Sequence, residues 1–272
     1  MSAPDRYAVI GHPISHSKSP LIHGMFAEQT GQAMSYDAID IAPDQLATDL
    51  KAFFARGGKG LNVTVPHKEQ IPALMNSLSE RATLAGAVNT IAIGNDGELT
   101  GDNTDGIGLL TDMLNLKADL EDSRILILGA GGATRGIVQP LLQAGPQLIT
   151  IANRTVAKAE ALAAHFDQAG NVFGSGYDDL GSKAYDVVIH ATSAGLGGEL
   201  PPVSDSIIGA DSFCYDLSYA DTDTPFIEWV KQSGCKRAHD GLGMLVEQAA
   251  AAFDIWRGIK PDTAPVIARL RN

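Results

Sequence analysis

Short apolar runs alternate with helical patterns along most of the chain, and no other feature constrains the fold as strongly. A strand, a helix and a second strand in succession favour a parallel sheet whose two faces are covered by helices. We therefore predict an α/β fold with parallel sheets. The runs that predict strands are residues 7–11, 36–40, 60–65, 88–94, 124–129, 148–153, 186–190 and 213–217.

The length of the chain, 272 residues, fits two domains of ordinary size. The sequence Asn95-Asp96-Gly97 is a hairpin signal, and it ends the first sheet region. A helix over residues 105–116 follows, and Arg124 begins a new βαβ unit. We place the first domain boundary in this region.

A last amphipathic helix follows Asp240-Gly241. Its apolar face carries Leu245, Ala249, Ala252, Phe253 and Trp256. We expect this helix to return to the first domain, because the six-stranded wound sheet of the second domain is already complete and the helix needs another apolar surface. The alternative is a helix that caps the second sheet. The predicted division is a discontinuous domain of residues 1–104 and 240–272, a second domain of residues 105–239, and a cleft between them.

The charge balance excludes several classes of partner. The chain has 20 basic and 32 acidic residues, a net charge of −12, which does not attract nucleic acid or an anionic membrane. We find no run of about 18 apolar residues and no secretory signal, so no membrane span is expected. Cys214 and Cys235 have neither metal-site spacing nor a disulfide framework. A reducing, cytoplasmic compartment is therefore expected.

A glycine-rich turn, Gly129-Ala130-Gly131-Gly132-Ala133, directly follows the apolar run that begins at Arg124. The glycines allow a tight turn and a close approach to a pyrophosphate. The helix after them offers free N–H groups and the positive end of its dipole to that anion. Glycines also mark ordinary turns, but the strand before and the helix after favour a dinucleotide site. We predict a Rossmann fold, a doubly wound parallel sheet, in the second domain.

The end of the next strand, Asn153-Arg154-Thr155, indicates which dinucleotide binds. NAD-specific sites usually place an acid here for the ribose 2′-hydroxyl, and this chain has none. Arg154 can instead hold a 2′-phosphate through two parallel hydrogen bonds, Thr155 can add a hydroxyl donor, and Lys158 can add charge. A solvated arginine without a ligand is the alternative. The pattern predicts NADP.

Polar residues also gather at the ends of apolar runs in the first domain. Pro66 stops the strand that begins near Gly60, so that Lys68 projects from a rigid bend. Asn89 sits inside an apolar run, where a buried amide needs partners. Asp105 opens a helix after residues 101–104. Taken singly, Lys68 would be a solvated lysine and Asp105 a charge that stabilises a helix N-terminus.

The ordered set of motifs resembles the shikimate dehydrogenase family over the whole chain. Any one motif is weak, whereas the set in this order is highly specific. The matching motifs are Gly11-His12-Pro13-Ile14-Ser15-His16-Ser17-Lys18-Ser19-Pro20, Asn62-Val63-Thr64-Val65-Pro66-His67-Lys68, Gly86-Ala87-Val88-Asn89-Thr90, Gly101-Asp102-Asn103-Thr104-Asp105-Gly106, Gly129-Ala130-Gly131-Gly132-Ala133, Asn153-Arg154-Thr155 and Asp240-Gly241-Leu242-Gly243-Met244-Leu245.

The resemblance implies that Lys68 and Asp105 are catalytic and flank the reacting hydroxyl. It implies that Ser15 and Ser17 bind the substrate carboxylate, for which two hydroxyls at i and i+2 of an extended segment point the same way. The substrate-binding residues that it implies are Ser15, Ser17, Thr64, Lys68, Asn89, Asp105, Tyr219 and Gln248. The cofactor-binding residues are Gly129, Ala130, Gly131, Gly132, Ala133, Asn153, Arg154, Thr155, Lys158, Thr192, Gly241 and Met244.

Three residues near these motifs have simpler interpretations as well. Gln248 lies on an otherwise apolar helix face, which suggests a ligand, although a hydrogen-bonded core glutamine is the alternative. Tyr219 could be an ordinary packing residue. Glu247 is expected to be a surface charge. A metal is not expected from the histidines at 12, 16, 23 and 67, because no carboxylate–histidine set accompanies them at helical spacing.

The function that the resemblance implies is the reversible NADPH-dependent reduction of 3-dehydroshikimate to shikimate, a step of chorismate and aromatic amino-acid biosynthesis. The expected protein is a cytoplasmic oxidoreductase, a monomer or homodimer, with a small-molecule substrate. One alternative is a quinate/shikimate dehydrogenase with looser substrate choice and a preference for NAD, although Arg154 argues against that preference. A second is a catalytically silent NADP-binding regulator, against which intact Lys68 and Asp105 argue. A third, a folate-type methylene dehydrogenase, would not need Ser15 and Ser17.

Overall fold

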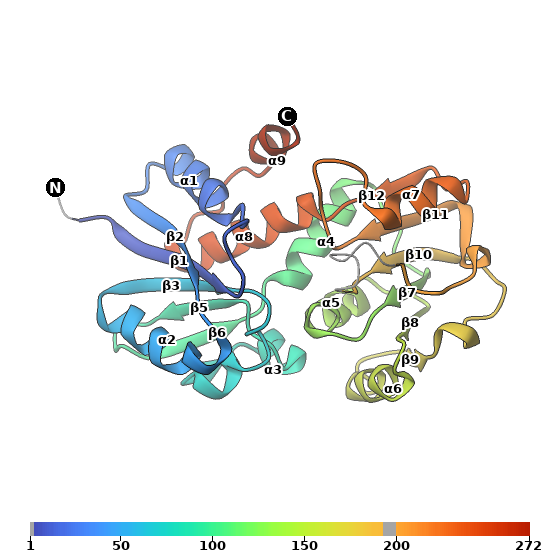
Figure 1. Ribbon diagram of the computed structural model, residues 1–272, viewed down its shortest axis with the longest axis horizontal. Helices are drawn as coiled ribbons and strands as arrows, with labels where there is room; N and C mark the ends of the chain where they lie inside the picture. The colour runs from blue at the N-terminus through green and yellow to red at the C-terminus, as the bar shows by residue number, and fades with distance from the viewer. Residues whose placement is uncertain (1–2, 193–199) are drawn as a thin grey trace. The chain divides into compact units, whose positions relative to one another are not determined.

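The computed structural model describes residues 3–192 and 200–272 and divides into two compact units (Figure 1). Unit 1 comprises Met1–Gly108 and Val246–Asn272, and unit 2 comprises Leu109–Leu245. The divisions lie a few residues after those placed from the sequence, inside helices α4 (Asp105–Asn115) and α8 (Leu242–Arg257). No helix in the described ranges is both long enough and apolar enough to cross a membrane.

Unit 1 contains a mixed six-stranded sheet, in the order β2-β1-β3-β5-β6-β4. The strands β1, β2 and β3 are parallel, but β5 runs antiparallel to both β3 and β6. The predicted hairpin at residues 95–97 joins β5 to β6 and accounts for that antiparallel pair. The α/β class is confirmed, but β5 also runs against β3, so the sheet of unit 1 is mixed where parallel sheets were expected. Its elements are β1 (Asp5–Gly11), α1 (Ser19–Thr30), β2 (Met34–Asp40), α2 (Leu46–Ala55), β3 (Gly58–Val63), β4 (Ser77–Leu78), α3 (Glu80–Ala85), β5 (Thr90–Ile93), β6 (Leu99–Asp102) and α9 (Ala264–Arg271), with 3₁₀ turns at Pro43–Gln45 and Ile71–Leu74.

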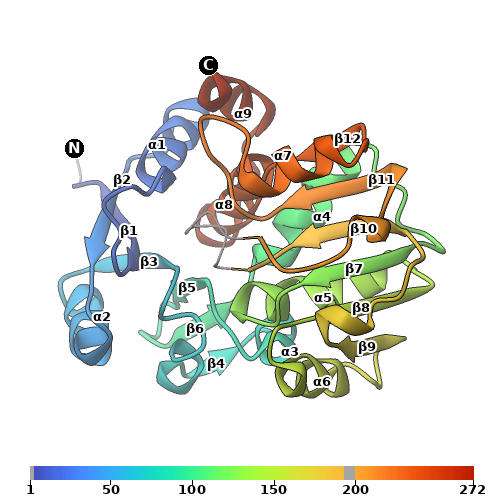
Figure 2. The same cartoon turned by 45° about the vertical axis from the view of Figure 1, so that its right-hand side comes forward.

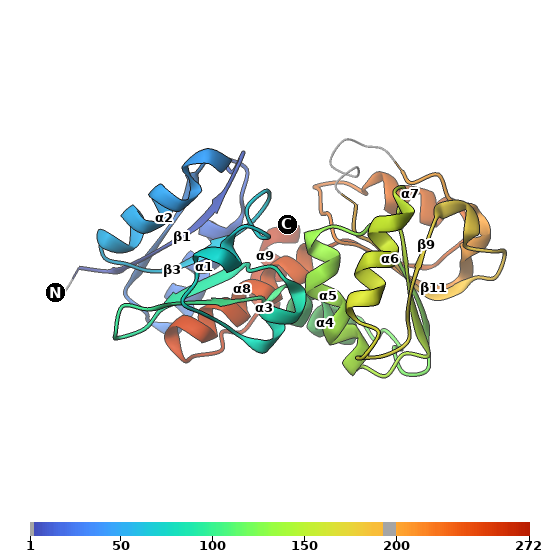
Figure 3. The same ribbon diagram turned by 90° about the horizontal axis from the view of Figure 1, so that it is seen from below.

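The two faces of this sheet are covered by different helices. Side chains of alternate strand residues, such as Ile10 and Leu61, pack against Leu50 and Phe53 of α2 on one face. The opposite face carries Tyr7, whose ring centroid lies 4.8 Å from that of Trp256 in α8. The helices α1 and α8 therefore lie on the face of the sheet away from α2 (Figures 1 and 3).

Unit 2 is a Rossmann fold. Its six strands are all parallel in the order β12-β11-β10-β7-β8-β9, which reverses between β7 and β10 as in a doubly wound sheet (Figure 2). The prediction of this sheet is confirmed. Its elements are β7 (Arg124–Leu128), α5 (Gly132–Gln143), β8 (Leu148–Ala152), α6 (Val156–His165), β9 (Val172–Ser175), β10 (Tyr185–His190), β11 (Ile208–Asp216), α7 (Pro225–Gln232) and β12 (Arg237–His239), with 3₁₀ turns at Tyr177–Asp179 and Asp205–Ile207.

Alternation along β7 shows how both faces of the second sheet are buried. Ile125 and Ile127 join a core with α4, α5 and α6, whereas Leu126 and Leu128 join another core with α7. Figure 3 shows α5 and α6 together on one side of this sheet. Helices on both faces leave only the strand ends for polar chemistry.

His23 is a buried polar residue in the aromatic core of unit 1. It is fully buried and stacks on Tyr36, with ring centroids 4.1 Å apart and planes at 9°. Burial lowers the pKa of His23 to about 3, and the Asn62 side chain offsets only part of this effect. The native protein therefore holds this imidazole neutral.

We predict that His23 makes the folded state sensitive to mild acid. Below about pH 6.5 the unfolded chain takes up a proton on this histidine that the native state cannot accept. The free energy of unfolding therefore decreases as the pH is lowered. Between pH 7.5 and pH 5, His23 should lower the free energy of unfolding by about 2 kcal/mol. Urea unfolding at both pH values should show that loss in the wild type and a smaller one in His23→Phe.

A matched control is His165→Gln, because His165 is exposed on α6. This control should keep the wild-type dependence on pH. Equal losses in the wild type and His23→Phe would contradict the assignment to His23.

Candidate active site

Lys68 and Asp105 form an ion pair in unit 1. Lys68 follows the strand β3 after the turn at Pro66, and Asp105 is the first residue of α4. Lys68 Nζ lies 2.6 Å from Asp105 Oδ2, with the side chains 18% and 6% exposed. A largely buried lysine–aspartate pair holds an ammonium proton in one place, as a proton donor to a substrate must.

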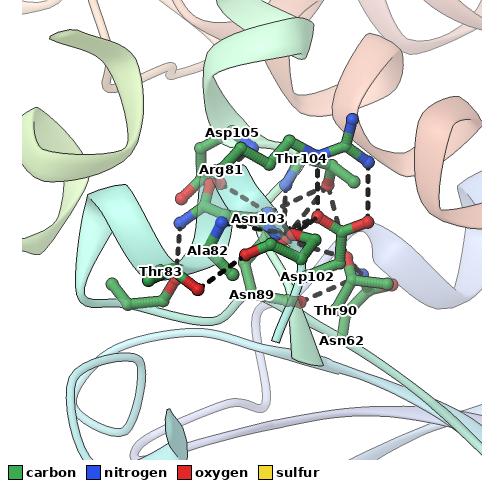
Figure 4. A network of polar contacts seen from close by, with 12 residues as sticks. Asn62, Arg81, Ala82, Thr83, Asn89, Thr90, Asp102, Asn103, Thr104 and Asp105 are labelled. Atoms are coloured by element: carbon green, nitrogen blue, oxygen red, sulfur yellow. Dashed lines mark hydrogen bonds and ion pairs between the residues drawn. The ribbon is translucent and has the colours of Figure 1, made fainter. Parts of the chain in front are cut away.

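The Asn89 side chain fixes the position of Asp105. Its Nδ2 donates to Asp105 Oδ1 at 2.8 Å and to Thr104 Oγ1 at 3.0 Å, and its Oδ1 accepts from the Thr104 backbone N–H at 2.8 Å. Asn89 is 2% exposed, so its amide has the partners expected of a buried polar group. Asn62, on β3, donates from Nδ2 to the Asn89 carbonyl oxygen at 3.3 Å. Figure 4 shows this network of side chains.

A second carboxylate, Asp102, supports the loop that leads to Asp105. Arg81 donates to it from Nε at 2.6 Å and from Nη2 at 2.7 Å, a bidentate pair visible in Figure 4. Ser79 Oγ also donates to Asp102 at 2.6 Å. Asn103 completes the loop, since its Oδ1 accepts from the Asp105 N–H at 3.1 Å. Sequence analysis assigned no role to Arg81 or Asp102.

Gln248 and Glu247 of α8 both accept hydrogen bonds through their side chains. Gln248 Oε1 accepts from Asn89 Nδ2 at 3.4 Å, so the structure brings Gln248 to the same cluster as Lys68 and Asp105. Glu247 is only 5% exposed, and Thr263 Oγ1 donates to its Oε1 at 2.7 Å. The expectation of a surface charge at Glu247 is therefore wrong. A hydrogen-bond partner near the C-terminus makes its burial tolerable.

The segment that carries Ser15 and Ser17 is a turn, not the extended strand that was expected. The Ser17 N–H donates to the Ile14 carbonyl at 3.0 Å, which closes this turn. Ser15 is exposed and Ser17 is partly exposed. Ser17 Oγ also accepts from the Ser19 N–H at the start of α1, at 3.3 Å. Thr64 follows β3, and its backbone N–H donates to the Ile10 carbonyl at 2.9 Å.

The glycine turn of unit 2 joins β7 to α5. Gly129 has φ +115°, and a Cβ there would come within 2.9 Å of the Ala191 carbonyl oxygen, so only glycine fits without strain. Gly131 precedes α5 with no side-chain cap, and a Cβ there would meet no atom within 4 Å. The space beside Gly131 at the N-terminus of α5 is therefore open, and the first N–H groups of a helix can bind an anion.

The end of β8 presents a cation beside this turn. Arg154 is exposed, and within the described residues it forms no ion pair. Thr155 precedes α6 without capping it through its side chain, and Lys158 is exposed one turn further on. Asn153 Nδ2 donates to the Thr155 carbonyl at 3.0 Å, which shapes the turn. These groups fit a nucleotide that carries a 2′-phosphate.

The other predicted cofactor residues of unit 2 lie close to its core. Met244 is 8% exposed, and its N–H donates to Tyr215 Oη at 3.2 Å. The Gly241 N–H donates to the Ser218 carbonyl at 2.9 Å. Tyr219, which was predicted to bind substrate, is partly buried, and this burial raises the pKa of its phenol. Ala130, Gly132, Ala133 and Thr192 lie at the glycine turn or, for Thr192, after β10.

The histidines considered for a metal lie in separate environments. His12 Nδ1 lies 2.6 Å from Asp40 Oδ1, which lowers the pKa of that exposed carboxyl. His67 Nε2 lies 2.8 Å from the Ile41 carbonyl, and His23 is in the aromatic core. In the parts of the chain that the structure describes, no group of three or more potential ligands could hold a metal ion.

A Rossmann unit with a glycine turn before a helix, together with a largely buried lysine–aspartate pair, is the arrangement expected of a pyridine-nucleotide-dependent dehydrogenase of alcohols. Three family models match the chain: the shikimate dehydrogenase substrate binding domain over residues 9–91, shikimate/quinate 5-dehydrogenase over residues 112–196, and the shikimate 5′-dehydrogenase C-terminal domain over residues 241–271.

Known proteins of similar sequence and structure agree with these matches. The NADP(+) shikimate dehydrogenase of Aeromonas salmonicida is 56% identical over 98% of both chains. The Ael1 enzyme of Pseudomonas putida is 45% identical with a TM-score of 0.92, covering 98% of both chains. The Thermus thermophilus shikimate 5-dehydrogenase, solved with NADP(H) and shikimate, is 33% identical with a TM-score of 0.87, covering 98% of this chain and 100% of that one. The chain belongs to the shikimate dehydrogenase family.

Proposed function

We propose that this chain catalyses the reversible NADPH-dependent reduction of 3-dehydroshikimate to shikimate, with Lys68 and Asp105 as its catalytic pair. The observation that carries the proposal is the ion pair between Lys68 Nζ and Asp105 Oδ2 at 2.6 Å. The Asn89 amide, itself 2% exposed, holds this pair in place. The NADP dependence of relatives such as the Aeromonas salmonicida enzyme supports the choice of cofactor.

Lys68 serves as the proton donor to the oxygen of the substrate carbonyl that is reduced. When bound, NADPH supplies the hydride for the reduction, and NADP⁺ accepts it in the reverse direction. As the carbonyl becomes an alkoxide, an N–H of Lys68 gives its proton to that oxygen, and in the reverse direction Lys68 takes it back. Asp105 keeps the ammonium group oriented and accepts a hydrogen bond from the substrate hydroxyl. Asn89, Thr64 and Gln248 bind the other ring hydroxyls.

Two hydroxyls of unit 1, those of Ser15 and Ser17, bind the substrate carboxylate. Ser15 is exposed on the turn, so its hydroxyl can reach a ligand. Ser17 Oγ already accepts the Ser19 N–H, which leaves its own hydrogen to donate to a carboxylate oxygen. The resemblance also assigns Tyr219 to substrate binding, and the raised pKa of its phenol keeps the hydroxyl protonated and able to donate.

Unit 1 is the substrate-binding catalytic domain, and unit 2 binds NADP. The glycine turn from Gly129 to Ala133 receives the pyrophosphate. Arg154, with Asn153, Thr155 and Lys158, receives the 2′-phosphate. Thr192, Gly241 and Met244 complete the cofactor site.

The cellular setting is the cytoplasm, and the assembly is a monomer or a homodimer. The two cysteines, Cys214 and Cys235, are free thiols whose Sγ atoms lie 3.8 Å apart. A pair of unlinked thiols so close together fits a reducing compartment.

We expect Lys68→Ala to lose turnover while shikimate binding changes little. The lysine acts on the transition state, so kcat and kcat/KM should fall together by roughly 10²–10⁴-fold. Steady-state kinetics with NADP⁺ and shikimate measures this fall. Lys59→Ala, which removes an exposed lysine of β3, is the matched control. Near-normal kcat in Lys68→Ala would remove this residue from the mechanism.

Ser15→Ala and Ser17→Ala are expected to act mainly on KM for shikimate. Each hydroxyl donates to a charged group, so each loss should raise KM about 10- to 100-fold. The exposed Ser182→Ala serves as control and should not change KM. A second measurement uses shikimate methyl ester. Binding of the ester as tight as that of the free acid would show that no carboxylate site exists here.

Cofactor choice is expected to depend on Arg154. Arg154→Asp removes two charge-assisted hydrogen bonds and places an anion near the phosphate. The ratio of kcat/KM for NADP⁺ to that for NAD⁺ should fall by roughly 10²-fold or more. Arg56→Asp makes the same change of charge at an exposed site and should keep the ratio.

The same assay, run on wild-type protein with shikimate and with quinate, tests the proposed function itself. The expected result is a strong preference for shikimate with NADP⁺. Turnover of neither alcohol would overturn the proposed function. Equal kcat/KM with NADP⁺ and NAD⁺ would show that Arg154 does not recognise the 2′-phosphate.

A further inference from the structure

Unit 2 contains a buried polar network at the carboxyl ends of β10 and β11. An imidazole lies there between a carboxylate and a hydroxyl. His190 Nδ1 is 3.0 Å from Asp216 Oδ1, and His190 Nε2 is 2.7 Å from Thr192 Oγ1. The His190 and Asp216 side chains are each 1% exposed. The roles proposed above make no use of either residue.

The partners of Asp216 determine where the imidazole proton sits. The Ser218 N–H donates to Oδ1 at 2.9 Å, and Thr224 Oγ1 donates to Oδ2 at 2.6 Å. An ionised carboxylate can only accept, so the His190 contact requires a hydrogen on Nδ1. In the neutral ring this tautomer leaves a lone pair on Nε2, and the Thr192 hydroxyl must donate to it. Thr192 Oγ1 is then an acceptor toward any further partner.

Thr192 lies directly beside the glycine turn. The Ala191 N–H donates to the Leu128 carbonyl at the end of β7, at 2.8 Å. A Cβ at Gly129 would lie 3.1 Å from Thr192 Cγ2. The strands β7 and β10 flank the reversal of strand order, where open α/β sheets bind their ligands.

The ring of His190 has little freedom to turn. It stacks on Phe226 of α7, with ring centroids 4.9 Å apart and planes at 13°. This stacking fixes the ring plane, and the two polar partners fix which nitrogen faces which group. A hydroxyl rotor that would otherwise turn freely is therefore held in one orientation.

We propose that Asp216 and His190 are positioning residues that hold the Thr192 hydroxyl as a hydrogen-bond acceptor for a donor of bound NADP, a ribose hydroxyl or the carboxamide N–H. The inference rests on the proposed function, which places NADP on unit 2. To the proposed contact of Thr192 with the cofactor it adds the direction of the hydrogen bond and the pair of residues, His190 and Asp216, that sets this direction.

The first test reads the tautomer in wild-type protein without ligand. Nitrogen-15 NMR of histidine-labelled protein should show His190 with a proton on Nδ1 and none on Nε2. In Asp216→Asn, the new amide can donate to Nδ1 and thereby move the ring proton to Nε2. A proton on Nε2 in the wild type would overturn the proposal.

The second test measures NADP⁺ binding by titration calorimetry. Thr192→Val removes the acceptor and should weaken binding about 3- to 10-fold. Thr192→Ser should bind more tightly than Thr192→Val, because it restores the hydroxyl. Thr150→Val makes the same exchange at a buried site on β8, and its affinity should equal that of the wild type. Wild-type affinity in Thr192→Val would overturn the proposal.

A double-mutant cycle separates positioning from a general structural role. His190→Phe should weaken binding, and the pair His190→Phe with Thr192→Val should bind no more weakly than Thr192→Val alone. Additive losses would show that His190 acts by another route and would overturn the proposal. If His190→Phe does not fold, Asp216→Asn takes its place in the cycle.

The outcomes distinguish this inference from the proposed function on which it rests. Wild-type protein that fails to bind NADP⁺ would overturn the proposed function and this inference with it. Wild-type protein that binds NADP⁺ and turns over shikimate, with Thr192→Val unchanged, would overturn this inference alone.

Discussion

The hydrogen-bond capacity of one buried amide constrains the rest of unit 1. Asn89 is 2% exposed, and an unsatisfied amide at that depth would cost roughly 1–3 kcal/mol for each missing partner. Its partners are Thr104, which directly precedes α4, Asp105, the first residue of α4, and Gln248 of α8. The amide therefore brings distant parts of the sequence together, and the carboxylate that meets Lys68 has its place because Asn89 needs an acceptor.

Unit 2 uses its strand ends in the same way but for a different ligand. The faces of its sheet are filled by two apolar cores, and the polar groups proposed to bind the cofactor lie where β7, β8 and β10 stop. The glycine turn, the Arg154 cation and the His190–Asp216 network all stand at such ends. Both units thus combine apolar faces, which stabilise the fold, with polar carboxyl ends that remain available for chemistry.

Much of this arrangement follows from sequence patterns with a physical cause. Continuous apolar runs predict the long buried strands, and a glycine series between strand and helix predicts the turn at Gly129. The short strands β4 and β6 have too few residues to show a period, so the mixed order of the first sheet was not predicted. Burial of Glu247 depends on Thr263, a partner that no local pattern indicates. The pair of Arg81 with Asp102 is likewise a tertiary contact.

The contact between Arg81 and Asp102 helps to fix the position of Asp105, although neither residue belongs to the ion pair that Asp105 forms with Lys68. Asp102 anchors the loop through Arg81 and Ser79, and neither side chain has been assigned a contact with substrate. Substitutions at position 81 or 102 would move the Asp105 carboxylate without changing Lys68 or Asp105 itself. Laboratory evolution toward alcohols of another ring shape therefore has a route through these supporting positions, in which small shifts of the loop accumulate before any substrate-facing residue changes.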